Sequence, residues 1–140
     1  VFVAVVSVVM SHLLTPYYFV ADDSFVADLD SLLAGQDFGD DLFYLSGTWH
    51  PHYGKPLEAY LSTMYGIHTV GGYYAHVASP EYLDGLTGGQ VEYVTDCTAL
   101  DTFYTSYDVS YVLVPRAYCS LLEDCGLVGE VRENLCLFPV

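Results

Sequence analysis

The chain has 140 residues, 53% of them hydrophobic, which suits a single domain with a buried core. The chain has 18 acidic residues but only three basic ones, Lys55, Arg116 and Arg132, and its formal net charge is −15. Because neutralising phosphates requires clustered Lys and Arg, this composition excludes nucleic acid as a partner.

The net charge reflects the scarcity of cations, and it suits two kinds of external medium. In concentrated salt the Debye length falls to about 3 Å at 1 M, so repulsion between carboxylates is screened. Below about pH 4 most carboxylates are protonated and the actual charge is small. An acidic surface in a neutral medium is a third interpretation. Composition therefore leaves a halophile, an acidophile and a neutral setting open.

The chain begins with an apolar segment that runs from Val1 to Val20 without a charged side chain. As an α-helix, a segment of this length spans about 30 Å, the thickness of a bilayer's hydrocarbon core. The aromatic residues near the end of this segment, Tyr17, Tyr18 and Phe19, match the belt of aromatic side chains found at membrane surfaces. One interpretation is a transmembrane helix that leads into an extracytoplasmic domain.

Two features of the same segment favour other interpretations. His12 is costly in lipid, and the Val-rich run over residues 1–9 has a strong preference for β-structure. A strand donated to a neighbouring subunit of a filament, or a strand of the domain's own core, needs similar residues. The sequence therefore predicts an apolar membrane or assembly segment, residues 1–21, and an extracytoplasmic domain, residues 22–140.

After this segment, short helical and strand patterns alternate. Asp23 or Ser24 is expected to cap a helix that continues to about Ala34 and ends at Gly35. Further helices are predicted over residues 57–65, 80–86, 98–106 and 116–124, and strands over 42–46, 67–70, 91–94, 109–114, 129–132 and 135–138. This order predicts an α/β fold with a small, largely parallel sheet and short helices, preceded by an apolar N-terminal helix or strand.

Four cysteines, Cys97, Cys119, Cys125 and Cys136, predict two disulfides in an exported protein, with three connectivities open. Cys119 and Cys125 would face different sides of one continuous helix, so they can bond each other only if the helix ends between them. Gly126 makes such an end plausible. Four buried thiols are the alternative. No CxxC spacing supports a zinc or thioredoxin-type site.

The most unusual local pattern is Trp49-His50-Pro51-His52-Tyr53. Two histidines at i and i+2 on extended backbone share a face, so His50 and His52 are candidate metal ligands. His68 and His76 could complete such a site. The alternative is an aromatic surface loop with hydrated imidazoles.

Aromatic side chains offer a second kind of site. Trp49, Tyr53, Tyr73 and Tyr74 are candidates for stacking against a sugar ring, although 14 tyrosines in the chain make some clustering expected. No nucleotide-binding, serine-hydrolase or zinc-protease motif occurs. Paired carboxylates such as Asp22 with Asp23 are explained by helix caps and solvated turns. We therefore expect no cofactor and no catalytic activity in this chain.

Several segments together resemble a known family. They are ADLDSLLAG (residues 27–35), LFYLSG (42–47), LSTMYGIHTVGGYYAHVASPEYLDGL (61–86) and LDTFYTSYDVSYVLVPRAY (100–118). The chain resembles the extracytoplasmic C-terminal domains of polytopic membrane glycosyltransferase-like proteins, namely the YfhO-like and 6-pyruvoyl-tetrahydropterin-synthase-related membrane proteins. The resemblance implies that a last transmembrane helix leads into the domain. It also implies a turn at Gly71, Gly72 and Tyr73, and a core strand from Tyr111 to Pro115.

In that family sugars are thought to be transferred from lipid-linked donors, by acids in loops between earlier membrane helices that this sequence lacks. We therefore expect a non-catalytic extracytoplasmic domain, membrane-anchored or at the cell surface, that contributes to glycan or acceptor binding. The alternative is a structural subunit of an extracellular filament or cell-envelope assembly, a homo-oligomer that polymerises through the segment from Val1 to Val20. A small secreted metal- or sugar-binding protein is a third hypothesis.

Overall fold

The computed structural model describes residues 22–47, 49, 54–70, 80–93 and 96–140. Its helices and strands are α2 (Asp23–Leu33), β1 (Leu42–Leu45), α3 (Gly54–Tyr65), β2 (His68–Val70), α4 (Pro80–Thr87), the 3-10 turn η1 (Val91–Tyr93), α5 (Cys97–Ser106), β3 (Val109–Pro115), the 3-10 turn η2 (Arg116–Tyr118), α6 (Cys119–Asp124), β4 (Glu130–Val131) and β5 (Leu135–Pro139). Within the described residues no helix is both long and apolar enough to cross a membrane. The apolar segment from Val1 to Val20 lies outside them.

The five strands form one sheet in the order β2-β1-β3-β5-β4. β1 pairs in parallel with both β2 and β3, whereas β5 runs antiparallel to both β3 and β4. The predicted α/β class is confirmed, but the prediction of a largely parallel sheet is wrong. A parallel neighbour requires a long crossover, and β4 is joined to β5 only by residues 132–134, so these two strands form a hairpin.

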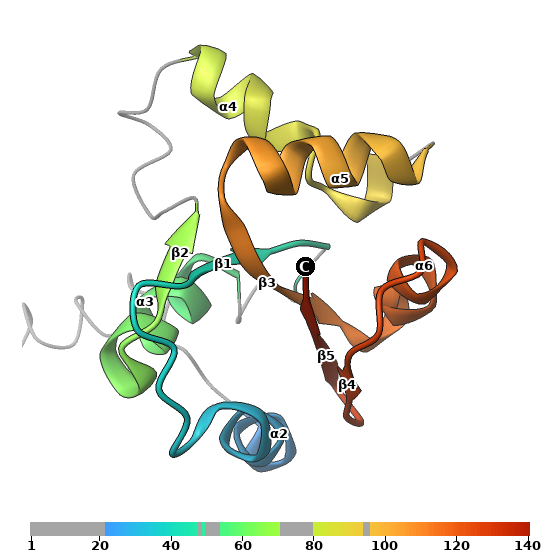
Figure 1. Ribbon diagram of the computed structural model, residues 1–140. Coiled ribbons are helices and arrows are strands. Elements are labelled where there is room, and N and C mark those ends of the chain that lie inside the picture. Colours follow the sequence, from blue (N-terminus) through green and yellow to red (C-terminus); the bar gives the residue numbers. More distant parts are fainter. Residues whose placement is uncertain (1–21, 48, 50–53, 71–79, 94–95) are drawn as a thin grey trace, which may run out of the picture.

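Helices cover both faces of this sheet (Figure 1), and alternate residues of β1, β3 and β5 enter two cores. The first core lies between the sheet and the helices α5 and α6, and the second between the sheet and the helices α2 and α3. In β3, Val112 and Val114 face α5 and α6, and Leu113 between them faces α2 and α3. β5 alternates in the same way, with Cys136 and Phe138 in the first core. This period of two on strands buried on both faces gives a three-layer arrangement.

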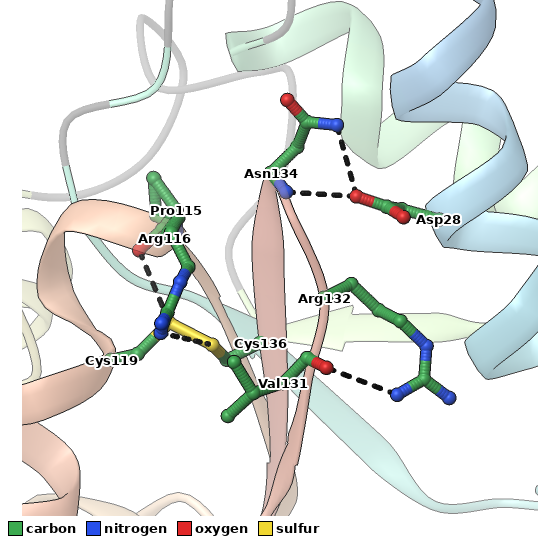
Figure 2. The surroundings of a disulfide bond; sticks show 8 residues. All are labelled: Asp28, Pro115, Arg116, Cys119, Val131, Arg132, Asn134 and Cys136. Atoms are coloured by element: carbon green, nitrogen blue, oxygen red, sulfur yellow. Dashed lines mark hydrogen bonds between the residues drawn. A yellow bond between two sulfur atoms is a disulfide. The ribbon is translucent and has the colours of Figure 1, made fainter.

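The α2 helix is positioned by its own cap and by the β4–β5 turn. Its N-cap is Asp22, whose carboxylate accepts a hydrogen bond from the Ser24 amide at 3.1 Å, so the expected cap at Asp23 or Ser24 is one or two residues off. Farther along, one Asp28 carboxylate oxygen accepts from both the backbone and the side-chain nitrogen of Asn134, at 2.8 and 2.9 Å (Figure 2). The helix is thereby attached to the end of the sheet.

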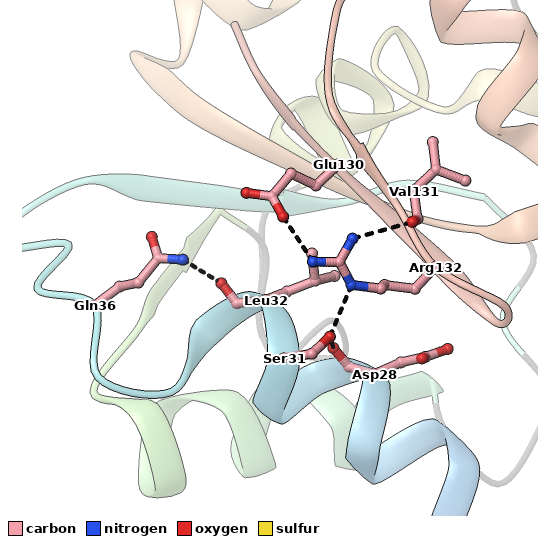
Figure 3. Close-up of polar contacts among 7 residues, drawn as sticks. All are labelled: Asp28, Ser31, Leu32, Gln36, Glu130, Val131 and Arg132. Carbon is pink, nitrogen blue, oxygen red and sulfur yellow. Dashed lines mark hydrogen bonds and ion pairs between the residues drawn. The ribbon is translucent and has the colours of Figure 1, made fainter.

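Arg132 makes a second connection between the same two elements (Figure 3). Its Nε donates to the Ser31 hydroxyl at 2.8 Å, and its Nη2 forms an ion pair with Glu130 at 2.7 Å. The third contact is Nη1 to the Val131 carbonyl at 3.1 Å. A basic residue in this acidic chain therefore holds α2 against the β4–β5 hairpin.

The end of β1 is held by Ser46, whose side chain is fully buried. Its hydroxyl donates to the Gly89 carbonyl at 2.7 Å and accepts from the Val91 amide at 3.0 Å. The strand predicted over residues 91–94 is wrong for its described part, because residues 91–93 form the turn η1. The Val91 amide bonds to the Ser46 hydroxyl, so it is not free to pair with a neighbouring strand.

Replacing Ser46 with alanine should lower the free energy of unfolding by about 2 kcal/mol. The substitution leaves a buried carbonyl and a buried amide without their partner, and each such loss costs about 1–3 kcal/mol. Urea unfolding followed by circular dichroism measures the change. Ser106→Ala, which removes an exposed hydroxyl, is the matched control and should stay within about 0.5 kcal/mol of the parent. Equal stability of the two variants would contradict the role assigned to Ser46.

Candidate functional site

All four cysteines form disulfides, Cys97 with Cys125 and Cys119 with Cys136. The prediction of two disulfides is confirmed, and one of the three connectivities is selected. Cys119 and Cys125 lie at the two ends of α6, and each bonds to a cysteine elsewhere in the chain. Because disulfides persist in oxidising compartments, the pair of bridges indicates an extracytoplasmic environment.

The Cys119–Cys136 bridge connects α6 to β5 inside the first core, where both cysteines are fully buried. Arg116 lies beside it, with Nη1 at 3.9 Å from the Cys136 sulfur, and the Arg116 amide donates to the Asn134 carbonyl at 2.9 Å (Figure 2). This bridge therefore ties the helix, η2 and the β4–β5 turn into one unit.

The Cys97–Cys125 bridge connects the first residue of α5 to the C-terminal end of α6. It borders a cavity of about 350 Å³, here called the α5 cavity. The residues that line it are Cys97, Leu100, Asp101, Tyr104, Thr105, Asp108, Val109, Cys125, Leu127 and Val140. The C-terminus, marked in Figure 1, contributes Val140 to this wall.

One stripe of the chain supplies the polar side of this cavity. Asp101, Tyr104, Thr105 and Asp108 follow one another at i, i+3, i+4 and i+7, and residues with this spacing share one face of a helix. Asp108 comes just after α5 and has a φ of 53°, a left-handed conformation that Asp tolerates better than most residues. Asp108 therefore lies beyond the end of the helix but still lines the cavity.

Tyr104 differs from the other polar residues of the stripe because it is buried, with 5% of its surface exposed. Burial raises the pKa of its phenol above the usual value, so the side chain remains neutral. Its hydroxyl has no hydrogen-bond partner within the described part of the chain. A buried hydroxyl of this kind is normally satisfied, so Tyr104 stands out as an unpartnered polar group within the cavity wall.

The apolar side of the cavity is formed by Leu100, Val109, Leu127 and Val140. Among the described residues that line it, none is Lys, Arg or His. The α5 cavity is therefore amphipathic and carries negative charge from Asp101 and Asp108. Its volume lies in the range of about 300–1,000 Å³ that is typical of small-molecule sites.

Most residues of the predicted metal and sugar-stacking sites lie outside the part of the chain that the structure describes. His50, His52, Tyr53, Tyr73 and Tyr74 all lie outside them, as does His76, and so the metal and sugar-stacking predictions for these residues stay predictions.

Two residues of that pattern are described. The half-buried Trp49 indole packs edge-on against Phe25, with ring centroids 6.3 Å apart, and its Nε1 has no partner among the described residues. His68 is exposed on β2. Among the described residues no three His, Cys, Asp or Glu side chains gather as metal ligands would.

The α5 cavity was not predicted from the sequence, although part of its wall has a signal there. The spacing of Asp101, Tyr104 and Thr105 places a partly polar stripe on one face of the predicted helix over residues 98–106, and Cys97 and Asp108 flank that helix. Such a stripe is ordinarily exposed to water. Only the position of the β5 end and of Leu127 over it turns this stripe into the wall of a cavity.

Comparisons with known proteins identify no relative of this chain. No protein-family model, no curated protein and no solved structure matches it. Its function is therefore argued from the site.

Proposed function

We propose that this chain is a non-catalytic, extracytoplasmic binding domain whose α5 cavity takes a neutral or amino sugar of a glycan. The observation that carries the proposal is the composition of the cavity wall, where two carboxylates, a threonine hydroxyl and a buried tyrosine face an apolar side. The membrane setting implied by the family resemblance is part of the same proposal, with the segment from Val1 to Val20 as the anchor.

The polar stripe matches the hydrogen-bonding needs of a sugar. Asp101 and Asp108 carboxylates accept hydrogen bonds from hydroxyl groups, and the Thr105 hydroxyl can both donate and accept. Bonds to charged groups are the stronger ones, worth about 1.5–3 kcal/mol each. The stripe can therefore orient a polyhydroxylated ring.

The apolar side complements the stripe. A pyranose ring presents C–H groups on its faces, and Leu100, Val109, Leu127 and Val140 offer a surface that these groups can contact. A cavity of about 350 Å³ has room for one sugar unit at the end of a chain.

Charge decides which sugars are suitable. Asp101 and Asp108 carry negative charge, the formal net charge of the chain is −15, and the described part of the cavity wall contains no cation. Uronic acids and phosphorylated sugars are therefore repelled, while neutral sugars are tolerated and protonated amino sugars are attracted.

Asp101→Asn and Asp108→Asn should each weaken binding of a neutral or amino oligosaccharide about ten-fold or more, because each removes a charged acceptor. Isothermal titration with the oligosaccharide that ranks highest on a glycan array measures this. Asn tolerates the left-handed backbone at Asp108, so the fold is kept.

Asp40→Asn provides the matched control, since Asp40 is exposed and does not line the cavity. It makes the same change of charge and should leave the affinity unchanged. Absence of any saccharide binding by the parent protein, or equal affinities of all three variants, would refute the proposed function.

A further inference from the structure

The two disulfides differ in how far a reagent in solution can reach them. Cys119 and Cys136 are fully buried, whereas Cys97 is exposed and Cys125 is half-buried. The Cys97–Cys125 bridge also borders two cavities, the α5 cavity and a second one of about 160 Å³. Because thiol–disulfide exchange requires a thiolate to approach a sulfur atom, this bridge is the accessible one.

The two sulfur atoms of this bridge belong to opposite kinds of helix end. Cys97 is the first residue of α5, directly after the N-cap Asp96, whose carboxylate accepts from the Thr98 amide at 3.0 Å. Cys125 is the C-cap of α6. The positive end of a helix dipole stabilises a thiolate, and the negative end does not. Cys97 is therefore the better leaving group, and attack at the Cys125 sulfur is the favoured first step.

Carboxylates flank the bridge on both sides. Asp101 and Asp108 line the α5 cavity, and Asp96 and Asp124 line the second cavity. No Lys, Arg or His is found among the lining residues that the structure describes in either cavity. A thiolate that carries a further negative charge is therefore repelled, whereas a thiol with an ammonium group is attracted.

We propose that Cys97–Cys125 is a redox-labile bridge that cationic thiols reduce in the folded protein, releasing the first turn of α5 from α6. An external thiolate attacks the Cys125 sulfur, a mixed disulfide forms, and Cys97 leaves as a thiolate. A second thiolate of the same reductant attacks the reductant's sulfur in the mixed disulfide. Cys125 then leaves as a thiolate, the reductant is oxidised to its own disulfide, and two electrons have passed to the protein.

Reduction acts on the α5 cavity because both cysteines line its wall. Without the bridge, the N-terminal turn of α5 is no longer joined covalently to α6, and Leu100 still packs against the first core. The consequence for ligand binding rests on the proposed function, whereas reduction and the release of the turn do not depend on it.

The experiment treats the folded protein, without denaturant, with cysteamine or with 2-mercaptoethanesulfonate at equal thiolate concentration. Alkylation and peptide mass analysis then identify the reduced cysteines. Cysteamine should reduce Cys97 and Cys125 about three- to ten-fold faster than the sulfonate at low salt, and 1 M NaCl should remove most of the difference. Cys119 and Cys136 should stay bonded. Reduction of both bridges together, or equal rates for the two thiols, would overturn the proposal.

Two further readouts separate the parts of the proposal. Asp124→Asn should reduce the preference for cysteamine, while the remote Asp40→Asn should leave it unchanged. Hydrogen exchange should accelerate in the first turn of α5 after reduction and stay slow in β3, and unchanged exchange in α5 would overturn the release of the turn. Saccharide titration of the oxidised protein tests the proposed function separately. If the oxidised protein binds no saccharide, the results on reduction and on hydrogen exchange still stand.

Discussion

Replacing Cys119 and Cys136 together by alanine should lower the free energy of unfolding by about 5 kcal/mol. The bridge closes a loop with a sequence separation of 17, for which the chain-entropy contribution is about 3 kcal/mol. Both cysteines are also fully buried, so their loss removes packing in the first core and leaves space that the core cannot fill. Since small domains are stable by only about 5–15 kcal/mol, this variant should be close to unfolding at 37 °C. Urea unfolding followed by circular dichroism measures the loss.

The matched comparison is the double variant Cys97→Ala with Cys125→Ala. Its bridge has a sequence separation of 28, and the chain-entropy contribution is similar, about 3–4 kcal/mol. Because Cys97 is exposed, however, little packing is lost with it. We expect this variant to be the more stable of the two. A larger loss for the exposed pair would contradict the division into a buried structural bridge and an accessible one.

Phe43→Ala should cost about 3–5 kcal/mol of unfolding free energy. Phe43 lies fully buried on β1 in the core beneath α2 and α3. Its ring stacks on Tyr111 with centroids 4.8 Å apart and meets Phe38 edge-on at 4.9 Å. Truncating such a ring removes the transfer free energy of the buried atoms and leaves a cavity whose neighbours can relax only partly.

Thermal and urea unfolding of the Phe43 variant measure this cost. Met64→Ala on α3 is the control, because Met64 is 60% exposed and should change the stability by no more than about 0.5 kcal/mol. A loss below about 1 kcal/mol for Phe43→Ala would contradict this prediction and would mean that the core repacks around the missing ring.

The periodic patterns of the sequence predicted most of the helices and strands. The helix ended by Gly35 and the strand at Val109–Pro115 were identified because their signals are local, namely a cap, a glycine with positive φ and a buried apolar run. The turn at residues 91–93 was misassigned as a strand. Its geometry depends on a hydrogen bond to Ser46, which lies far away in the sequence.

The α5 cavity was not predicted for the same reason. Local spacing places Asp101, Tyr104 and Thr105 on one helix face, but it does not say what lies opposite. Leu127 and Val140 reach this face from distant parts of the chain. The sheet's mixed direction is also non-local, since it depends on which strands the β4–β5 hairpin joins.

By itself, the sequence determined the acidic charge, the α/β class and the even number of cysteines that predicts disulfides in an exported protein. These properties follow from composition and from local periodicity, which require no knowledge of distant contacts. That nucleic acid is not a partner stays a prediction from the charge. The tertiary structure alone decided which cysteines bond, which bridge is accessible and which carboxylates share a cavity. Each of these depends on packing between segments that are far apart in the chain. Many different tertiary arrangements are compatible with the same local pattern.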